Sequence, residues 1–248
     1  GAGYFGHCGE LLRYLGARPL LVTGKHSARR TGMLEHALEQ VPAAVVFDEV
    51  EENPGTAVCE RGAELCRAHQ CDCVVALGGG SPMDAAKAIA VLATNPGRCA
   101  DYFGAKKYKA APLPIAAIPT TSGTGSEVTP YAVLTQESDN TKRTISGAAL
   151  FPRLAICDPA LTYTAPRAVT AATGLDALSQ CMEGILSRSG TPLGDVLALE
   201  GIRLVCAYLP RALDTPDELT VSHAWRDEKK PREYGERFFE TAKNSYSI

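Results

Sequence analysis

Short apolar runs alternate with longer amphipathic segments through the first half of the chain. The apolar runs are rich in Val, Leu, Ile and Ala and lie at residues 18–24, 43–50, 71–79 and 112–120. Segments with helical spacing flank and separate them, at residues 6–15, 28–40, 54–69 and 81–93. Strands that are apolar throughout and joined by helices are typical of a parallel sheet covered on both faces. The sequence therefore predicts an α/β domain of the doubly wound kind.

The pattern changes after residue 120. Residues 131–146 predict a β-hairpin, because two strand-like runs flank turn residues, and helical spacing prevails from about residue 165. The end of the chain is highly charged and has little apolar periodicity. We therefore predict an α/β domain over 1–157, the start of an all-helical second domain over 158–213, and a divergent charged tail over 214–248.

Composition and charge argue against several classes of protein. Hydrophobic residues make up 45% and charged residues 21%, as in ordinary globular proteins. A net charge of -3 gives no electrostatic reason to expect a nucleic acid or an anionic membrane as partner. No apolar run approaches the roughly 20 residues that span a bilayer, so we expect a cytoplasmic protein. The nine cysteines form no CxxC pair and are predicted to be reduced, buried thiols.

A glycine-rich turn at residues 78–80 joins a buried strand to a helix. Glycines let the backbone turn tightly near a ligand, and the helix start offers unpaired N–H groups, which is how a pyrophosphate is held. Ser81 and Pro82 suit the N-cap and the first helical position, and Asp84 completes a pattern similar to a capping box. A tight turn without a ligand can also be rich in glycine, and this one matches neither GxGxxG nor the Walker sequence. Lys87, one turn into the helix, is consistent with a solvated charge.

Five segments, in this order, resemble the iron-containing, metal-dependent alcohol dehydrogenase family: VTGKHS at 22–27, ENP at 52–54, GGGSPMDAAKAIA at 78–90, PTTSGTGSEVT at 119–129 and ATGLDALSQCMEG at 172–184. The resemblance extends to about Leu213. It implies a dinucleotide-binding domain over 1–157 and a helical metal-binding domain that begins within 158–213, with the active site in the cleft between them. It also implies interconversion of an alcohol with an aldehyde or ketone, using NADP or NAD and one divalent metal, iron or zinc.

The resemblance further implies a set of cofactor-binding residues. Those that would contact or approach the pyrophosphate are Gly79, Gly80, Ser81 and Asp84. Asn53 would lie beside the cofactor, and the ribose and nicotinamide end would be lined by Thr120, Thr121, Ser126 and Lys142. The alternative interpretation of Lys142 is a hairpin lysine exposed to water.

The cofactor preference follows from a missing carboxylate. An acidic residue at this place would bond the adenosine ribose hydroxyls and repel a 2′-phosphate. Gly24 stands where family members that favour NAD carry Asp, and Lys25, His26 and two arginines follow it. We therefore expect NADP(H) to be favoured over NAD(H), with a solvated helix start as the alternative interpretation of the cations.

The metal site that the family implies is incomplete in this sequence. Asp176 matches a family metal ligand, and Gln180 stands where the family has a histidine ligand. An amide oxygen is a poorer ligand than imidazole for iron or zinc. The two later histidine ligands are not found, and His223 is better read as an exposed tail residue. No catalytic residue is assigned.

Three interpretations stay open. The chain is part of a longer dehydrogenase, starting after the family's first strand, or a shortened, catalytically silent nucleotide-binding homologue, or a related polyol or sugar-phosphate enzyme. The first predicts a small alcohol or aldehyde as substrate. Apolar surface left exposed on the helical part would favour association of the chain with itself.

Overall fold

The computed structural model of the chain describes residues 1–214. His223 and residues 215–248 of the predicted charged tail lie outside this range. The described residues form two compact units. The first consists of Gly1–Thr120 and Ser126–Asp158, and the second of Thr121–Gly125 and the residues from Pro159 onward. The domain boundary at residue 157 stays a prediction, and the two units are described separately.

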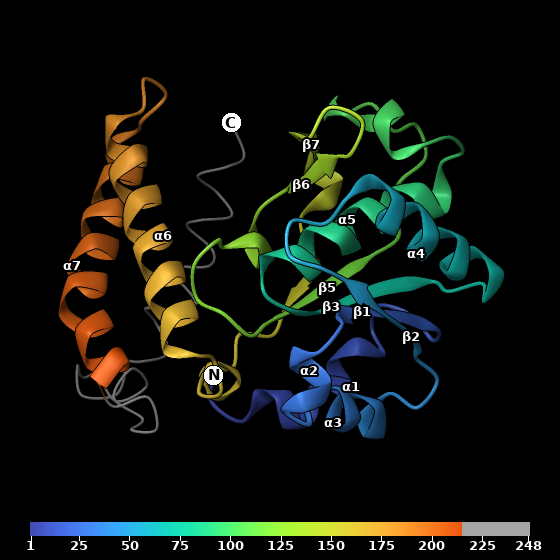
Figure 1. Cartoon of the computed structure of the whole chain (residues 1–248), viewed down its shortest axis with the longest axis horizontal. Helices are drawn as coiled ribbons and strands as arrows, with labels where there is room; N and C mark the ends of the chain where they lie inside the picture. Colours follow the sequence, from blue (N-terminus) through green and yellow to red (C-terminus); the bar gives the residue numbers. More distant parts are fainter. Residues whose placement is uncertain (215–248) are drawn as a thin grey trace. The chain divides into compact units, whose positions relative to one another are not determined.

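A five-stranded parallel sheet forms the centre of the first unit (Figure 1). Its strands lie in the order β2-β1-β3-β5-β8, and every neighbouring pair is parallel. The bounds are β1 (Pro19–Gly24), β2 (Val45–Val50), β3 (Cys73–Gly78), β5 (Ile115–Pro119) and β8 (Leu154–Ala155). The sequence predicted the first four strands to within a few residues. The α/β prediction is confirmed.

Helices cover both faces of this sheet. Their bounds are α1 (Cys8–Leu12), α2 (Ser27–Arg30), α3 (Met33–Gln40), α4 (Thr56–Ala68) and α5 (Gly80–Thr94). In Figure 1, α4 and α5 lie on one face, and α1, α2 and α3 lie on the other. The single helix predicted over 28–40 is two helices, because Gly32 between them adopts a left-handed conformation with φ 74°. The helix predicted over 6–15 is a 3₁₀ turn, η1 (Tyr4–His7), followed by the short α1.

A second, three-stranded sheet in the order β4-β7-β6 packs on α5. Its strands are β4 (Gly104–Ala105), β6 (Tyr131–Gln136) and β7 (Thr141–Ser146). The pair β6 and β7 forms the predicted antiparallel hairpin. Short 3₁₀ turns complete the unit: η2 (Cys99–Tyr102), η3 (Ser126–Val128) and η4 (Ala148–Leu150). Helix α5 therefore lies between the parallel sheet and the hairpin.

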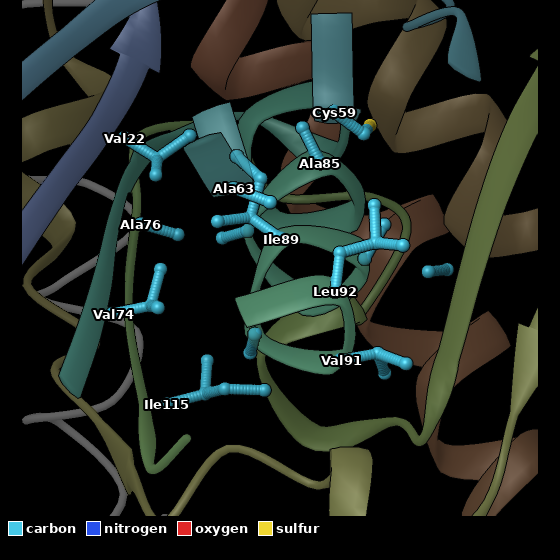
Figure 2. Packing of buried hydrophobic residues seen from close by; sticks show 14 of the residues in the cluster. Val22, Cys59, Ala63, Val74, Ala76, Ala85, Ile89, Val91, Leu92 and Ile115 are labelled. Atoms are coloured by element: carbon cyan, nitrogen blue, oxygen red, sulfur yellow. The ribbon is translucent and has the colours of Figure 1, made fainter. Parts of the chain in front are cut away.

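This position explains the composition of α5 and the hydrophobic core around it. Figure 2 shows Val74 and Ile115 of the sheet near Ile89 of α5, which is fully buried. Alanines at 85, 86, 88 and 90 are also fully buried, and their small side chains permit close packing on several sides of the helix. All nine cysteines are free, as predicted. Six are buried, Cys157 and Cys181 are half-buried, and Cys206 is exposed.

The second unit contains the 3₁₀ turn η5 (Pro159–Thr162) and the long helices α6 (Arg167–Leu186) and α7 (Pro192–Asp214). The two helices lie side by side and pack on each other (Figure 1). Several large apolar side chains on them are exposed: Leu175, Met182, Leu186, Leu193, Val196 and Leu199. Among residues 1–214, no helix combines the length and the apolar character needed to cross a membrane.

Candidate functional site

The candidate site lies where the strand order of the parallel sheet reverses. Strands β1 and β3 are neighbours, but the chain leaves β1 toward β2 and leaves β3 toward β5, on opposite sides. In open α/β sheets, ligands bind at the carboxyl ends of the strands at such a switch point. Gly24 ends β1 and Gly78 ends β3. The glycine-rich turn is therefore at the place where this topology favours ligand binding.

A pocket of about 380 Å³ lies at this edge of the sheet, within the usual size range of small-molecule sites. Three turns line it, following β1, β2 and β3: Gly24, Lys25, His26, Ser27, Val50, Glu51, Glu52, Gly79, Ser81 and Pro82. Four of the predicted cofactor residues thus meet in one pocket. Glu51 and Glu52 were not selected as site residues from the sequence. A signal was present, because the carboxylates of DEVEENP directly follow an apolar run.

The geometry of the glycine turn corrects the predicted cap. Gly78 has φ 150°, and a Cβ there would lie 2.7 Å from Cγ of Pro82, so a side chain is excluded. Helix α5 begins at Gly80, its N-cap is Gly79, and no side chain caps it. The predicted N-cap role of Ser81 is wrong, because the helix begins two residues earlier than that role requires. An uncapped helix start leaves N–H groups and the positive end of the helix dipole available to an anion.

Asn53 joins three segments at the edge of this site. Its backbone has φ 54°, and its N–H donates to Oγ of Ser81 at 3.3 Å. Its Oδ1 accepts from Nζ of Lys142 at 2.8 Å, and its carbonyl accepts from the hydroxyl of Thr135 at 3.2 Å. The structure therefore brings Asn53, Ser81 and Lys142 together. Lys142 is exposed, but its ammonium group has a specific partner.

Lys87 is not solvated, contrary to the expectation from its helix position. Its side chain is fully buried, and Nζ donates to Oγ of Ser126 at 2.7 Å and to the carbonyl of Tyr131 at 2.8 Å. Burial lowers the pKa of Lys87 to about 8. The sequence did contain a signal, since residues 82–92 are apolar except for Asp84 and Lys87. A helix that is apolar all round is buried.

Asp84 belongs to the same network and does not cap the helix. Its Oδ1 accepts from the Ser126 hydroxyl at 2.8 Å and its Oδ2 from the N–H of Val133 at 3.2 Å. Burial raises the pKa of Asp84, and the nearby Lys87 ammonium and the Ser126 hydrogen bond partly offset this. Ser126 is only 4% exposed. Its hydroxyl is therefore bound inside the protein, between helix and hairpin.

Two of the cations after β1, Lys25 and Arg29, are paired with carboxylates. Lys25 forms an ion pair with Glu51, and this hydrogen bond lowers the pKa of Glu51. Arg29 contacts Asp48 at 2.8 Å and Glu35 at 3.7 Å. The excess positive charge expected at this edge is thus largely compensated. Only the missing carboxylate at Gly24 still supports a preference for NADP(H).

The two neighbouring threonines fall in different units. The N–H of Thr120, after β5, donates to the carbonyl of Gly78 at 2.9 Å, so Thr120 lies beside the glycine turn. Thr121 clusters with the second unit. The structure thus brings Thr120 next to the predicted cofactor residues of the first unit.

The predicted metal ligands Asp176 and Gln180 lie one turn apart on α6, and both are exposed. Nε2 of Gln180 donates to Oδ2 of Asp176 at 3.0 Å. Within residues 1–214, no three His, Cys, Asp or Glu side chains are grouped as a metal site requires. Iron and zinc sites usually have at least three protein ligands. One carboxylate and one amide do not fit such a site by themselves.

Comparison with known proteins decides the family. Residues 1–159 match the family model of iron-containing alcohol dehydrogenase, and residues 170–225 match the model of the C-terminal part of the same family. The chain belongs to the iron-containing alcohol dehydrogenase family. The resemblance found in the sequence motifs is therefore confirmed.

Individual members of the family show the same relationship. NAD-dependent methanol dehydrogenase of Bacillus methanolicus is 32% identical over 228 residues, which are 90% of this chain and 60% of that protein. 1,3-Propanediol dehydrogenase of Citrobacter freundii is 38% identical over 211 residues, 83% of this chain and 54% of the relative. The structure of sulfoacetaldehyde reductase from Bifidobacterium kashiwanohense, in complex with NAD+, matches with a TM-score of 0.83 and 34% identity, over 99% of this chain and 62% of that one. The chain thus spans less than two thirds of each of these relatives.

Proposed function

We propose that this member of the iron-containing alcohol dehydrogenase family binds a nicotinamide dinucleotide and interconverts a small alcohol with an aldehyde or ketone. The observation that carries the proposal is the pocket at the β1/β3 switch point, next to the uncapped start of α5. The names of the relatives, which act on methanol, 1,3-propanediol and sulfoacetaldehyde, support the reaction class.

In this proposal, different residues bind different parts of the cofactor. Gly79, Gly80 and Ser81 present the first turn of α5 to the pyrophosphate. Asp84 is proposed near the pyrophosphate, and the residues proposed for the ribose and nicotinamide end are Asn53, Thr120, Thr121, Ser126 and Lys142. When bound, the nicotinamide supplies or accepts the hydride. The contribution of the protein is to hold and orient it, because positioning of the reacting groups accounts for much of enzymatic rate enhancement.

We further propose that NADP(H) is favoured. Gly24 places no carboxylate at the end of β1 to repel a 2′-phosphate, whereas Glu51 and Glu52, which follow β2, line the same pocket as Lys25 and His26. The ion pair between Lys25 and Glu51 weakens this argument. The B. methanolicus relative is named NAD-dependent and the Bifidobacterium structure contains NAD+, so NAD(H) is the alternative.

Asp176 is proposed as one ligand of a divalent metal, iron or zinc, with Gln180 as a weaker ligand or a neighbouring group. When bound, such a metal would polarise the substrate oxygen. Because the described residues offer only these two donors, no step of the reaction is assigned to the metal. Nucleotide binding without turnover is kept as the alternative function.

One experiment separates these two functions from each other and from the polyol enzyme. Binding of NADPH and NADH to the chain is measured by fluorescence, and turnover is followed with short aldehydes and polyols after metal stripping and after addition of Fe²⁺ or Zn²⁺. Metal-dependent turnover of aldehydes supports the oxidoreductase. Nucleotide binding without turnover supports the silent homologue, turnover of polyols alone supports the polyol enzyme, and absence of nucleotide binding contradicts all three.

The apolar side chains exposed on α6 and α7 further support association of the chain with itself. We expect light scattering at micromolar concentration to give a mass above that of one chain. A mass of 26.3 kDa, that of a single chain, contradicts the association.

A further inference from the structure

Among residues 1–214, the hydrogen-bond partners of the buried Lys87 ammonium all lie in one segment outside its own helix. The distances from Nζ are 2.7 Å to Oγ of Ser126, 3.5 Å to Oγ1 of Thr129 and 2.8 Å to the carbonyl of Tyr131. Ser126 belongs to η3, Tyr131 begins β6, and Thr129 lies between the two elements. A single side chain of α5 thus connects this helix to the segment that leads into the hairpin.

The same segment is held a second time by Asp84, one turn earlier on α5. An ammonium group can only donate and a carboxylate can only accept, so the Ser126 hydroxyl must accept from Lys87 and donate to Asp84. The second carboxylate oxygen accepts from the N–H of Val133. Residues at i and i+3 share a helix face. One face of α5 therefore binds both ends of segment 126–133.

Stability does not explain why a lysine occupies this position. A buried charge carries a large desolvation penalty, and well-packed apolar residues of similar volume often replace buried ionic groups without loss of stability. Ile89 and the alanines nearby show that apolar side chains fill this helix. A methionine would fit the pattern and avoid the penalty. The specific partners of Lys87 therefore point to a role in positioning.

The segment that Lys87 holds is connected to the candidate cofactor site through the hairpin. Thr135 on β6 and Lys142 on β7 both donate to Asn53. Asn53 in turn donates to Ser81 in the first turn of α5. A continuous series of contacts thus leads from Ser81 through Asn53 and the hairpin to Lys87. Helix α5 itself connects Lys87 back to Ser81.

We propose that Lys87 is a positioning residue that fixes the β6–β7 hairpin against α5, so that Asn53 and Lys142 are held in place at the dinucleotide. It acts through Ser126, Asp84 and the main chain of Tyr131. The inference rests on the proposed function, since the contacts that Lys87 organises are those of the proposed cofactor site.

The test compares Lys87→Met with Asn95→Ala. Asn95 is a matched control, because it is also buried, follows α5 as its C-cap, and binds main-chain groups of residues 109 and 110, away from the cofactor site. We expect Lys87→Met to weaken NADPH binding by about tenfold or more, as charged hydrogen bonds are lost. We expect Asn95→Ala to lower stability without weakening NADPH binding. Equal NADPH affinity in the two variants overturns the inference.

Amide hydrogen exchange provides a readout that needs no cofactor. The N–H of Val133 is bonded to Asp84, so its exchange should become about tenfold faster in Lys87→Met, relative to globally protected amides. In Asn95→Ala the loss of protection should be confined to the N–H groups of residues 109 and 110. If the wild-type chain binds no nicotinamide nucleotide, the proposed function fails, and unchanged exchange at Val133 would then reject the positioning role separately.

A pH titration of the wild-type chain tests the same idea without a variant. The charged groups acting on Lys87 are Asp84 on its own helix and Glu127 in η3, while β6 contributes neutral groups. We expect NADPH affinity to fall as Lys87 loses its charge near pH 8, because neutral amines form weaker hydrogen bonds. The pKa of Lys87 is lower in the folded than in the unfolded chain, so this group makes folding more favourable as pH rises from about 8 to 10.5. Affinity that stays constant from pH 7 to about pH 9.5 overturns the inference even if Lys87→Met does not fold.

Discussion

Nζ of Lys142 donates a 2.8 Å hydrogen bond to Oδ1 of Asn53, although the two residues are 89 positions apart. The contact joins strand β7 of the hairpin to the loop between β2 and α4. Because the N–H of Asn53 also bonds Ser81, three segments meet at this residue. The orientation of Lys142 at the candidate cofactor site therefore depends on the side chain of Asn53.

Asn53→Ala should weaken NAD(P)H binding by about tenfold, because Lys142 loses its fixed partner. The left-handed backbone at φ 54° adds strain of about 1 kcal/mol for alanine. Asn140→Ala is the matched control, since Asn140 has φ 51° and is exposed in the hairpin turn. Fluorescence titration measures the binding. Equal weakening in both variants would assign the effect to backbone strain rather than to Lys142.

Gly24→Asp should reverse the proposed cofactor preference. A Cβ at Gly24 would lie 3.5 Å from the carbonyl of Val50, an ordinary contact, so the side chain fits. The new carboxylate should weaken NADPH binding by about tenfold or more through repulsion of the 2′-phosphate, and strengthen NADH binding. Gly24→Asn, which has the same shape without the charge, is the control. If Asp and Asn change NADPH affinity equally, the effect is steric and the argument from charge fails.

Glu137 of the hairpin caps helix α4. Its two carboxylate oxygens accept from the hydroxyl of Thr56 and, at 3.0 Å, from the N–H of Ala57. Burial raises the pKa of Glu137, but these hydrogen bonds outweigh it, so the pKa lies below its ordinary value. A lowered pKa means that the stabilisation is present above the unfolded pKa of about 4.3 and is lost as pH falls through the folded pKa.

Glu137→Gln should therefore lower the free energy of unfolding by about 1 kcal/mol at pH 7, and the difference from wild type should shrink as pH falls through the lowered pKa of Glu137. Urea denaturation at several pH values measures this. Glu64→Gln, on the exposed face of the same helix, is the control and should change stability little. A difference for Glu137→Gln that does not depend on pH would contradict a charged cap.

Gly62 marks the closest approach of α4 and α5. A Cβ there would lie 2.4 Å from Cδ1 of Ile89 and 3.0 Å from Cε1 of Phe47. Ile89 is enclosed by core residues and cannot move aside easily (Figure 2). Gly62→Ala should thus cost about 1–3 kcal/mol from overpacking, although alanine is the better helix former.

Adding Ile89→Val removes the clashing methyl group and should restore part of the stability lost in Gly62→Ala. Gly184→Ala in α6 is the control. No atom lies within 4 Å of its added Cβ, so it should be neutral or stabilising. Thermal or urea unfolding is measured for the wild type, Gly62→Ala, Ile89→Val, the double variant and the control. If the double variant is as unstable as the sum of the single ones, the steric explanation is wrong.

The sequence predicted the parallel sheet and the glycine turn because both depend on local patterns. An apolar run such as CDCVVAL predicts a buried strand, and the glycines after this run predict a turn. The environment of Lys87 depends on long-range packing. Its partners at 126–131 lie about forty positions away, and only the hairpin resting on α5 turns an isolated lysine into a buried one.

The predicted N-cap at Ser81 was wrong for a different reason. The residue order SPMD satisfies the local rule for a helix start, but the backbone at Gly79 and Gly80 lets the helix begin earlier. Asp84 accepts a hydrogen bond from Ser126, which is distant in the sequence, and does not cap its own helix. Likewise, the ion pair of Lys25 with Glu51 joins two turns whose proximity only the β1–β2 pairing creates.

Gln180→His should strengthen metal binding at α6. Imidazole is a better ligand than an amide for Zn²⁺ and Fe²⁺, and position 180 lies one turn from the Asp176 carboxylate, on the same face. We expect affinity for Zn²⁺ or Co²⁺ to rise by about tenfold or more, measured by competition with a chromophoric chelator. Met182→His introduces an imidazole on the same helix without a carboxylate at i±3 or i±4 and is the control. Equal affinity in the two variants, or no loss on adding Asp176→Asn to Gln180→His, would exclude Asp176 as a ligand of the bound metal.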